Sequence, residues 1–296
     1  MPPLLRRPRR FGAPASAAAA LVIASSPPPA VAQTRTFLYT VVTPTSATPP
    51  PRSLVYTDLA YGERMFAAVG PEHLEPRVAA QLGLSRRVTL LVQAGWAPAD
   101  DAVRNRLSGQ AEALLSILPA GSRATLALGT GAMCDYGGTF VALGRVVAAY
   151  RWNRSELAAN LRFEHAFAAA ADAGEFARRD PLDVITTAGL MQDVGAGLSI
   201  GVETIGEDLE GFWEADEAEG GAKLMIGPTL SVRPPGLPWQ LLLGVGAIFH
   251  LTYSTQPGTA SGAARDLTTG QGYVVRASVT YQLGAAGRDR DGLAAP

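Results

Sequence analysis

Apolar and polar residues alternate along most of the chain after about residue 70. In residues 150–164, YRWNRSELAANLRFE, aromatic and aliphatic side chains alternate with arginine, glutamate and asparagine on both sides of Asn153-Arg154. Alternation with a period of two over such a length is typical of a β-strand with one apolar and one polar face. The pattern, looser in one segment, predicts about eleven strands: residues 74–84, 88–96, 110–118, 124–134, 140–152, 157–167, 183–191, 196–205, 222–233, 239–251 and 273–283.

Two segments allow a second interpretation. Residues 103–118 also fit a short helix. Residues 33–52 are rich in threonine and proline, which favours an extended tail or loop. Within them, residues 36–43 also fit a strand.

The lengths of the strands and of their connections predict a closed barrel. A strand that spans a membrane needs about 9–11 residues, whereas strands of soluble sandwiches are usually nearer five or six. Short turns, as at 85–86, 119–122, 153–154, 192–195 and 234–238, alternate with connections that are mostly longer, as at 97–109, 168–182, 206–221 and 252–271. Short turns at one end and long loops at the other are the layout of outer-membrane barrels. The fold class is therefore all-β, a closed antiparallel transmembrane barrel.

Such a barrel needs one more strand before residue 74 if both of its ends lie on the side of the short turns. Residues 54–59 and 63–69 are the candidates. The total is then about 12 strands, with 10 or 14 left open because the first 70 residues are ambiguous.

The turn at Asn153-Arg154 also predicts a register. Trp152 then faces Ser155, Arg151 faces Glu156, and Arg145 faces Arg162. Arg151 and Glu156 form an opposite-charge pair across the two strands. The charged residues share one face, which predicts a polar lumen, and the aromatic residues near the strand ends face lipid.

The N-terminus has the features of an export signal. Four arginines among residues 6–10 precede an alanine-rich apolar stretch, and Ala30-Val31-Ala32 matches a cleavage site before Gln33. Removal of residues 1–32 takes four arginines and no acids, so the formal charge falls from −1 to −5. The single cysteine, Cys134, excludes an internal disulfide. An acidic chain without a basic domain is a poor candidate for nucleic-acid binding.

The last predicted strand ends in VVRASVTYQL, residues 274–283, which looks like the C-terminal signal of outer-membrane barrels. With the strand pattern, this sequence resembles Gram-negative outer-membrane β-barrel proteins, in particular porin-like and transporter-like barrels. It departs from the family pattern because Leu283 replaces the terminal aromatic residue and residues 284–296 follow. The resemblance implies a signal peptide (1–32), a periplasmic segment (33–52), a barrel (53–284) and a tail (285–296). It also implies contact with outer-membrane lipids, lipopolysaccharide, the barrel-assembly machinery and small solutes.

The polar faces of the strands predict the residues that line the lumen. A porin with weak anion preference is the favoured function, because basic residues outnumber acids there. The predicted lumen residues are Glu75, Arg77, Glu112, Arg123, Arg145, Arg151, Arg162, Glu164, Glu203, Lys223, Arg233 and Arg276. The alternatives are a closed structural or ligand-binding barrel held by salt bridges, and a path for a hydrophobic molecule along inward apolar residues such as Val141, Leu143, Val147, Leu242 and Ile248.

Other chemistry has weaker support. Residues 206–221, GEDLEGFWEADEAEGG, form an acidic loop that fits a solvated surface better than a calcium site, since its spacing is not that of an EF-hand. His250, Thr252 and Ser254 share one parity, but no GxSxG motif is present. We therefore expect no enzyme activity, no metal site and no cofactor, with a barrel lipid hydrolase as the least favoured alternative.

Overall fold

The computed structural model describes residues 35–45, 52–62, 73–96, 107–119, 121–134, 140–167, 183–207, 222–251 and 272–283. These ranges contain twelve strands and no helix that is long and apolar enough to cross a membrane. The strands are β1 (Ser53–Gly62), β2 (His73–Gly83), β3 (Val88–Trp96), β4 (Leu107–Ser116), β5 (Ala124–Cys134), β6 (Phe140–Trp152), β7 (Ser155–Ala166), β8 (Asp183–Gly195), β9 (Leu198–Glu207), β10 (Ala222–Val232), β11 (Trp239–Leu251) and β12 (Gly272–Leu283).

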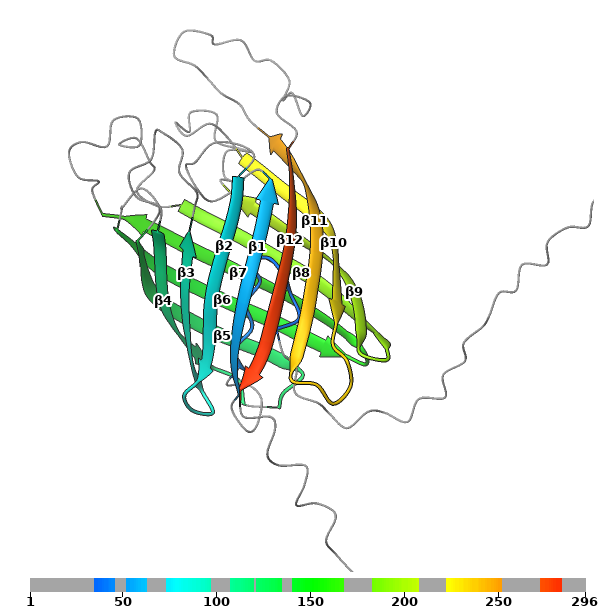
Figure 1. Ribbon diagram of the computed structural model, residues 1–296. Helices are drawn as coiled ribbons and strands as arrows, with labels where there is room; N and C mark the ends of the chain where they lie inside the picture. Colours follow the sequence, from blue (N-terminus) through cyan, green and yellow to red (C-terminus); the bar gives the residue numbers. More distant parts are fainter. Residues whose placement is uncertain are drawn as a thin grey trace, which may run out of the picture. The chain divides into compact units, whose positions relative to one another are not determined.

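The strands form one closed antiparallel barrel (Figure 1). Each strand pairs with its neighbours in the sequence, and β1 closes the ring by pairing with β12. The predicted fold class and strand number are therefore confirmed. The missing strand corresponds to the candidate at 54–59, because β1 covers Ser53–Gly62. Within the segment that also fitted a helix, Leu107–Ser116 form strand β4.

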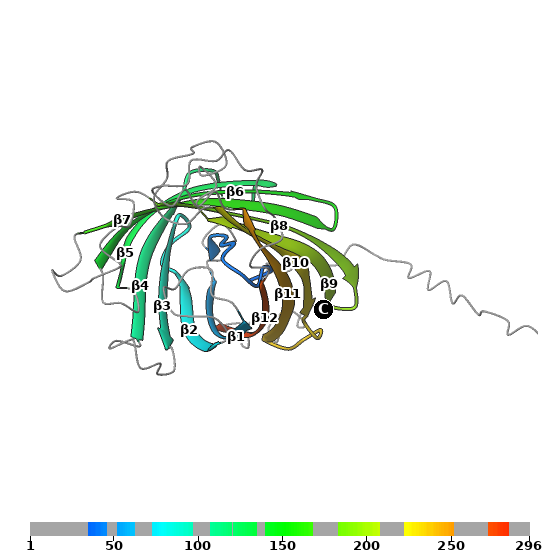
Figure 2. The same cartoon turned by 90° about the horizontal axis from the view of Figure 1, so that it is seen from above.

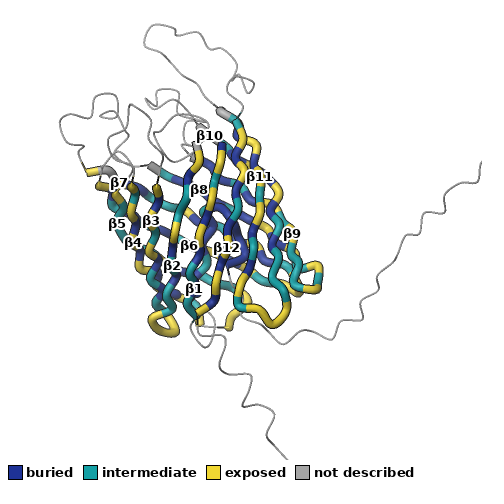
Figure 3. Tube along the Cα trace, viewed as in Figure 1, coloured by how far each residue is buried: buried dark blue, intermediate teal, exposed yellow. Residues whose placement is uncertain are grey.

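The two faces of the wall differ sharply in burial, and buried and exposed residues alternate along each strand (Figure 3). Aliphatic residues that point outward are exposed, for example Val78 at 55% and Leu128 at 50%. Charged and polar residues that point inward are buried, for example Glu112 and Asn160 at 1% each. This distribution is the reverse of the one in a water-soluble protein, where charged residues are almost never fully buried unless they are paired.

The short turns set the register of neighbouring strands. In the β6–β7 hairpin Trp152 pairs with Ser155, Arg151 with Glu156 and Arg145 with Arg162, as the sequence predicts. The turn between β8 and β9 lies at 196–197 instead of 192–195. Both of its residues have positive φ, 53° at Ala196 and 76° at Gly197, and an irregularity at Asp193/Gly195 lets β8 run on to this turn.

Residues 35–45, which we call the inner segment, lie inside the barrel (Figures 1 and 2). None of them belongs to a strand, although residues 36–43 also fitted one, and nearly all of them are buried. Side chains on the barrel wall bind the backbone of the inner segment. The assignment of residues 33–52 to a periplasmic segment stays a prediction. Residues 1–34 and 284–296, and with them the proposed signal peptide and tail, lie outside the described residues.

Candidate functional site

Six of the twelve predicted lumen residues form three ion pairs with one another along the inner wall. Glu75 and Arg77, two residues apart on β2, form a bidentate pair with N–O distances of 2.8 and 2.9 Å. Arg162 and Glu164 also pair two residues apart, on β7, where two guanidinium nitrogens donate to one carboxylate oxygen. The excess of basic residues is therefore not a ring of free positive charge, and anion preference does not follow from it.

Arg145 and Glu112 form a pair that joins strands β6 and β4 across β5. Two guanidinium nitrogens of Arg145 each lie 2.7 Å from a carboxylate oxygen of Glu112. The side chain can cross β5 because the inward positions there are Gly129 and Gly131, which stand opposite Arg145 and Glu112. Arg145 thus pairs with Glu112, whereas Arg162, its partner in the register, pairs with Glu164.

The remaining predicted lumen residues have different environments. Arg151 is partly exposed and donates to the buried Glu156 at 3.1 Å. Arg123 is exposed in the turn before β5, and Arg233 is half-buried just after β10, so neither lies on a strand. The backbone of Lys223 lies on β10, and its side chain is outside the described residues. Glu203 and Arg276 contact or approach the inner segment.

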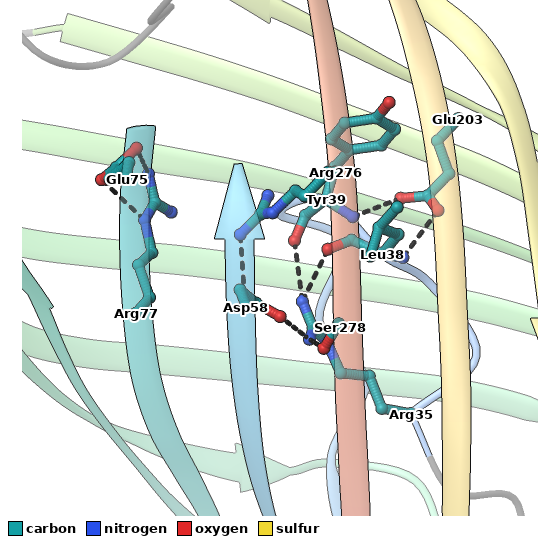
Figure 4. A network of polar contacts seen from close by, with 9 residues as sticks. All are labelled: Arg35, Leu38, Tyr39, Asp58, Glu75, Arg77, Glu203, Arg276 and Ser278. Carbon is teal, nitrogen blue, oxygen red and sulfur yellow. Dashed lines mark hydrogen bonds and ion pairs between the residues drawn. The ribbon is translucent and has the colours of Figure 1, made fainter. Parts of the chain in front are cut away.

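Asp58 anchors the start of the inner segment to the wall (Figure 4). Its two carboxylate oxygens accept from Arg35 and Arg276, each at 2.8 Å. Arg35 also donates to the Ser278 hydroxyl at 2.9 Å, and its guanidinium carbon lies 4.0 Å from the centre of the Tyr56 ring. A buried carboxylate between two arginines is stable only while all three charges remain together.

Glu203 binds the backbone of the inner segment (Figure 4). One carboxylate oxygen accepts from the N–H of Leu38 at 2.6 Å, and the other accepts from the N–H of Tyr39 at 2.8 Å. Arg35 donates to the carbonyl oxygens of the same two residues, at 2.7 and 3.2 Å. The backbone at Leu38-Tyr39 is therefore held by opposite charges, in hydrogen bonds that are stronger than neutral ones.

Asn160 on β7 holds the middle of the inner segment. Its side-chain oxygen accepts from the N–H of Val42 at 2.7 Å, and its nitrogen donates to the carbonyl oxygen of Val42 at 3.0 Å. This is the two-bond pattern by which neighbouring strands pair. Arg145 donates to the same amide oxygen at 3.2 Å, which orients Asn160 for this contact. Further on, the hydroxyls of Thr45 and Thr89 lie 3.4 Å apart.

Apolar contacts complete the fit of the inner segment. Phe37 and Val41 pack with Ala149, Ala158 and Met191. Leu38 and Tyr39 pack in a second cluster, which includes the inward residues Leu242 and Ile248 that the sequence marked as apolar exceptions in the lumen. These two residues are therefore covered by protein. They do not line a free path for a hydrophobic molecule.

Two glycines on the wall make room for the inner segment. A methyl group at Gly189 would come within 2.4 Å of the Phe37 ring, and one at Gly244 within 2.6 Å of the Leu38 side chain. Both distances are shorter than real contacts of this kind. The wall therefore has hollows at the positions where these two side chains insert.

The charged state of the inner segment follows from its surroundings. Burial alone would lower the pKa of the Arg35 guanidinium, but the Asp58 carboxylate holds that pKa above its ordinary value. Burial, and after it the charge of Glu203, raises the pKa of the Tyr39 phenol. Arg35 is thus always charged and Tyr39 neutral at ordinary pH.

Sequence reasoning missed Arg35, Asp58, Asn160 and Ser278 as parts of the site. Asp58 lies on the strand that the sequence left ambiguous, because its inward neighbours Leu54 and Tyr56 are apolar and obscure the alternation. The polar parity of β7 and β12 could have indicated Asn160 and Ser278. No signal of this kind marks Arg35, which lies outside any strand.

Several candidate features lie outside the described residues. These are loop residues 208–221, Thr252, Ser254 and the side chain of His250. Glu164 and His165 point to opposite faces, since Glu164 pairs with Arg162 inside and His165 contacts Phe167 on the outer face. Within the described ranges, no group of three or more histidine, cysteine, aspartate or glutamate residues could hold a metal ion.

No protein-family model matches the chain, and no curated protein is detectably similar to it. Several solved outer-membrane barrels are similar in structure. A KdgM porin has a TM-score of 0.47 and 13% identity, over 77% of this chain and 98% of that one. An anion-selective porin from Comamonas acidovorans has a TM-score of 0.38 and 10% identity, over 78% and 98% of the two chains. OccK7 from Pseudomonas aeruginosa has a TM-score of 0.36 and 12% identity, over 78% and 65%. These values are too low for an argument about function.

Proposed function

We propose that the protein is an outer-membrane β-barrel that passes small solutes through a lumen narrowed by the inner segment. The observation that carries this proposal is the inversion of the two faces, with exposed aliphatic residues outside and buried ion pairs inside. Only a closed barrel satisfies all backbone groups of β-strands in lipid, so such an exterior fits a membrane. The N-terminal export signal that the sequence predicts supports the same location.

The polar wall supports passage of hydrophilic solutes. Ion pairs such as Glu75–Arg77 and Arg162–Glu164 lie on the inner face of the wall. A wall of paired charges favours polar solutes without strong preference for either sign of charge. The inner segment is the main obstacle to passage, and it is held by non-covalent contacts alone.

The test is conductance of the purified full-length protein in planar lipid bilayers. A shift in gel mobility on boiling and a strand-rich circular dichroism spectrum should first establish that the barrel is folded. We expect discrete conductance steps that are absent from a detergent blank, with little preference between potassium and chloride. A folded barrel that inserts and never conducts would contradict the proposal.

A sealed barrel is the second candidate, and the inner segment is the observation that favours it. The inner segment lies in the lumen and is held there by Asp58 on β1, Asn160 on β7 and Glu203 on β9. Such a barrel would bind a ligand or support the membrane without transport. It predicts that conductance stays absent even when the contacts of the inner segment are broken.

A further inference from the structure

The wall of the lumen recognises peptide backbone. Glu203 accepts from two consecutive backbone N–H groups, and Asn160 pairs with both the N–H and the carbonyl of Val42. Contacts of this type do not depend on the side chains of the bound chain. They require only an extended backbone in the correct register.

The wall also provides sites for particular side chains of the bound chain. Asp58, Ser278 and the Tyr56 ring receive the guanidinium of Arg35. The hollow at Gly189 receives the ring of Phe37, and the one at Gly244 receives Leu38. A chain that fits therefore carries an arginine followed, after one residue, by a run of apolar side chains.

The groups that make this site belong to the barrel itself. They come from β1, β7, β8, β9, β11 and β12, and each is fixed by strand pairing that does not involve the inner segment. Glu203 is a buried carboxylate on this wall, and it accepts hydrogen bonds from two backbone N–H groups of the inner segment. Without that segment, the carboxylate would need other donors, since an unpaired buried charge is costly.

We propose that the lumen is a binding site for an extended peptide, which residues 35–45 occupy in cis. A separate peptide of the same chemistry, an arginine with an apolar run after it, binds there when the inner segment is displaced. The inner segment competes at the high effective concentration of a tethered ligand, so it masks the site in the intact chain. The inference goes beyond the proposed conduction, because peptide binding is measured without ion flow.

The test uses the full chain with a recognition site for a specific protease placed between residues 46 and 51. After folding in detergent and cleavage, the inner segment is no longer tethered and can exchange. The probe is a fluorescent peptide, RTFLYTVVTPT, with the sequence of residues 35–45. We expect saturable binding by fluorescence anisotropy, displaced by the unlabelled peptide and not by a scrambled peptide of equal composition.

Wall variants show whether the probe binds at the proposed site. Glu203→Gln removes the second acceptor for the backbone N–H groups and should weaken binding by about tenfold or more, as expected for a charge-assisted hydrogen bond. The matched control is Glu164→Gln, another carboxylate on the inner face, whose described partner is Arg162. The control should leave binding unchanged.

Binding no tighter than that of the scrambled peptide, in a cleaved barrel shown to be folded, overturns the inference. Equal loss in the two wall variants overturns it as well. If the cleavable chain does not fold, the uncut chain with Arg35→Ala is used with a photo-reactive probe peptide. Sequence-specific cross-links to β8, β9 or β12 are expected, and their absence overturns the inference. Peptide binding without conductance would support the site and reject the proposed transport.

Discussion

Arg145 on β6 and Glu112 on β4 form a bidentate ion pair across β5, with both N–O distances at 2.7 Å. The pair is almost completely buried, and Arg145 also orients the amide of Asn160. It therefore links the stability of the wall to the site that holds the inner segment. Gly129 and Gly131 are what allow the contact, since any side chain there would stand between the two strands.

We expect Glu112→Ala to destabilise the barrel by about 3–5 kcal/mol, because it leaves the Arg145 charge buried without its partner. The measurement is the free energy of unfolding in guanidinium chloride, followed by gel mobility of the folded form. The double variant Glu112→Leu/Arg145→Met is the control, since it removes both charges and should recover much of the loss. Equal stability of the single variant and the unmodified protein would contradict the prediction.

We expect Asp58→Asn to loosen the inner segment and increase conductance. The change removes the charge that holds Arg35 and Arg276, both at 2.8 Å. Loss of a charge-assisted hydrogen bond costs about 1.5–3 kcal/mol, which raises the population of the displaced segment by about tenfold or more. Planar-bilayer recordings give the readout. The control is Arg86→Gln, which removes an exposed charge in the turn after β2 and should conduct as the unmodified protein does.

We expect Gly189→Ala to expel Phe37 from its hollow. The new methyl group would lie 2.4 Å from the ring, and such overpacking costs about 1–3 kcal/mol. The readout is a water-soluble maleimide that reacts with Thr36→Cys in a Cys134→Ser background, because Thr36 is buried and Cys134 is exposed.

Labelling of Thr36→Cys should be slow in the parent protein. It should be about tenfold faster or more with Gly189→Ala, because overpacking against Phe37 favours release of the inner segment. Gly109→Ala is the control, since a methyl group at Gly109 meets no atom within 4 Å. Equal labelling in the parent and both glycine variants would show that Phe37 is not held at this hollow.

We expect Leu161→Arg to destabilise the protein in lipid bilayers. Leu161 is 41% exposed on the outer face of β7, and an arginine facing the middle of a bilayer costs about 2–4 kcal/mol. Leu84→Arg, at a site 62% exposed in the turn after β2, should have little effect. Unfolding in lipid vesicles distinguishes the two variants. In a water-soluble barrel, both substitutions would be tolerated, so equal effects would contradict the membrane location.

Local pattern was enough to predict the wall of the barrel. The alternation around Asn153-Arg154 places Arg151 opposite Glu156 and Arg145 opposite Arg162, and the structure has this register. Successive side chains on a strand point to opposite faces of the sheet. A strand with one polar and one apolar face therefore has polar and apolar residues at alternate positions in the sequence. The inward direction of Glu112 and Glu164 follows from the same rule, whereas the twelfth strand was predicted from the need to close the barrel.

Alternation, strand length and the spacing of the turns are local properties of the chain, and together they predict a closed barrel. What fills the barrel depends on contacts between distant parts of the chain. The inner segment has no periodic pattern, and its partners Asp58, Asn160 and Glu203 are far from it along the chain. The pairing of charges also depends on the tertiary structure, since Arg145 reaches Glu112 across two glycines of β5 instead of pairing with the residue opposite it in the register.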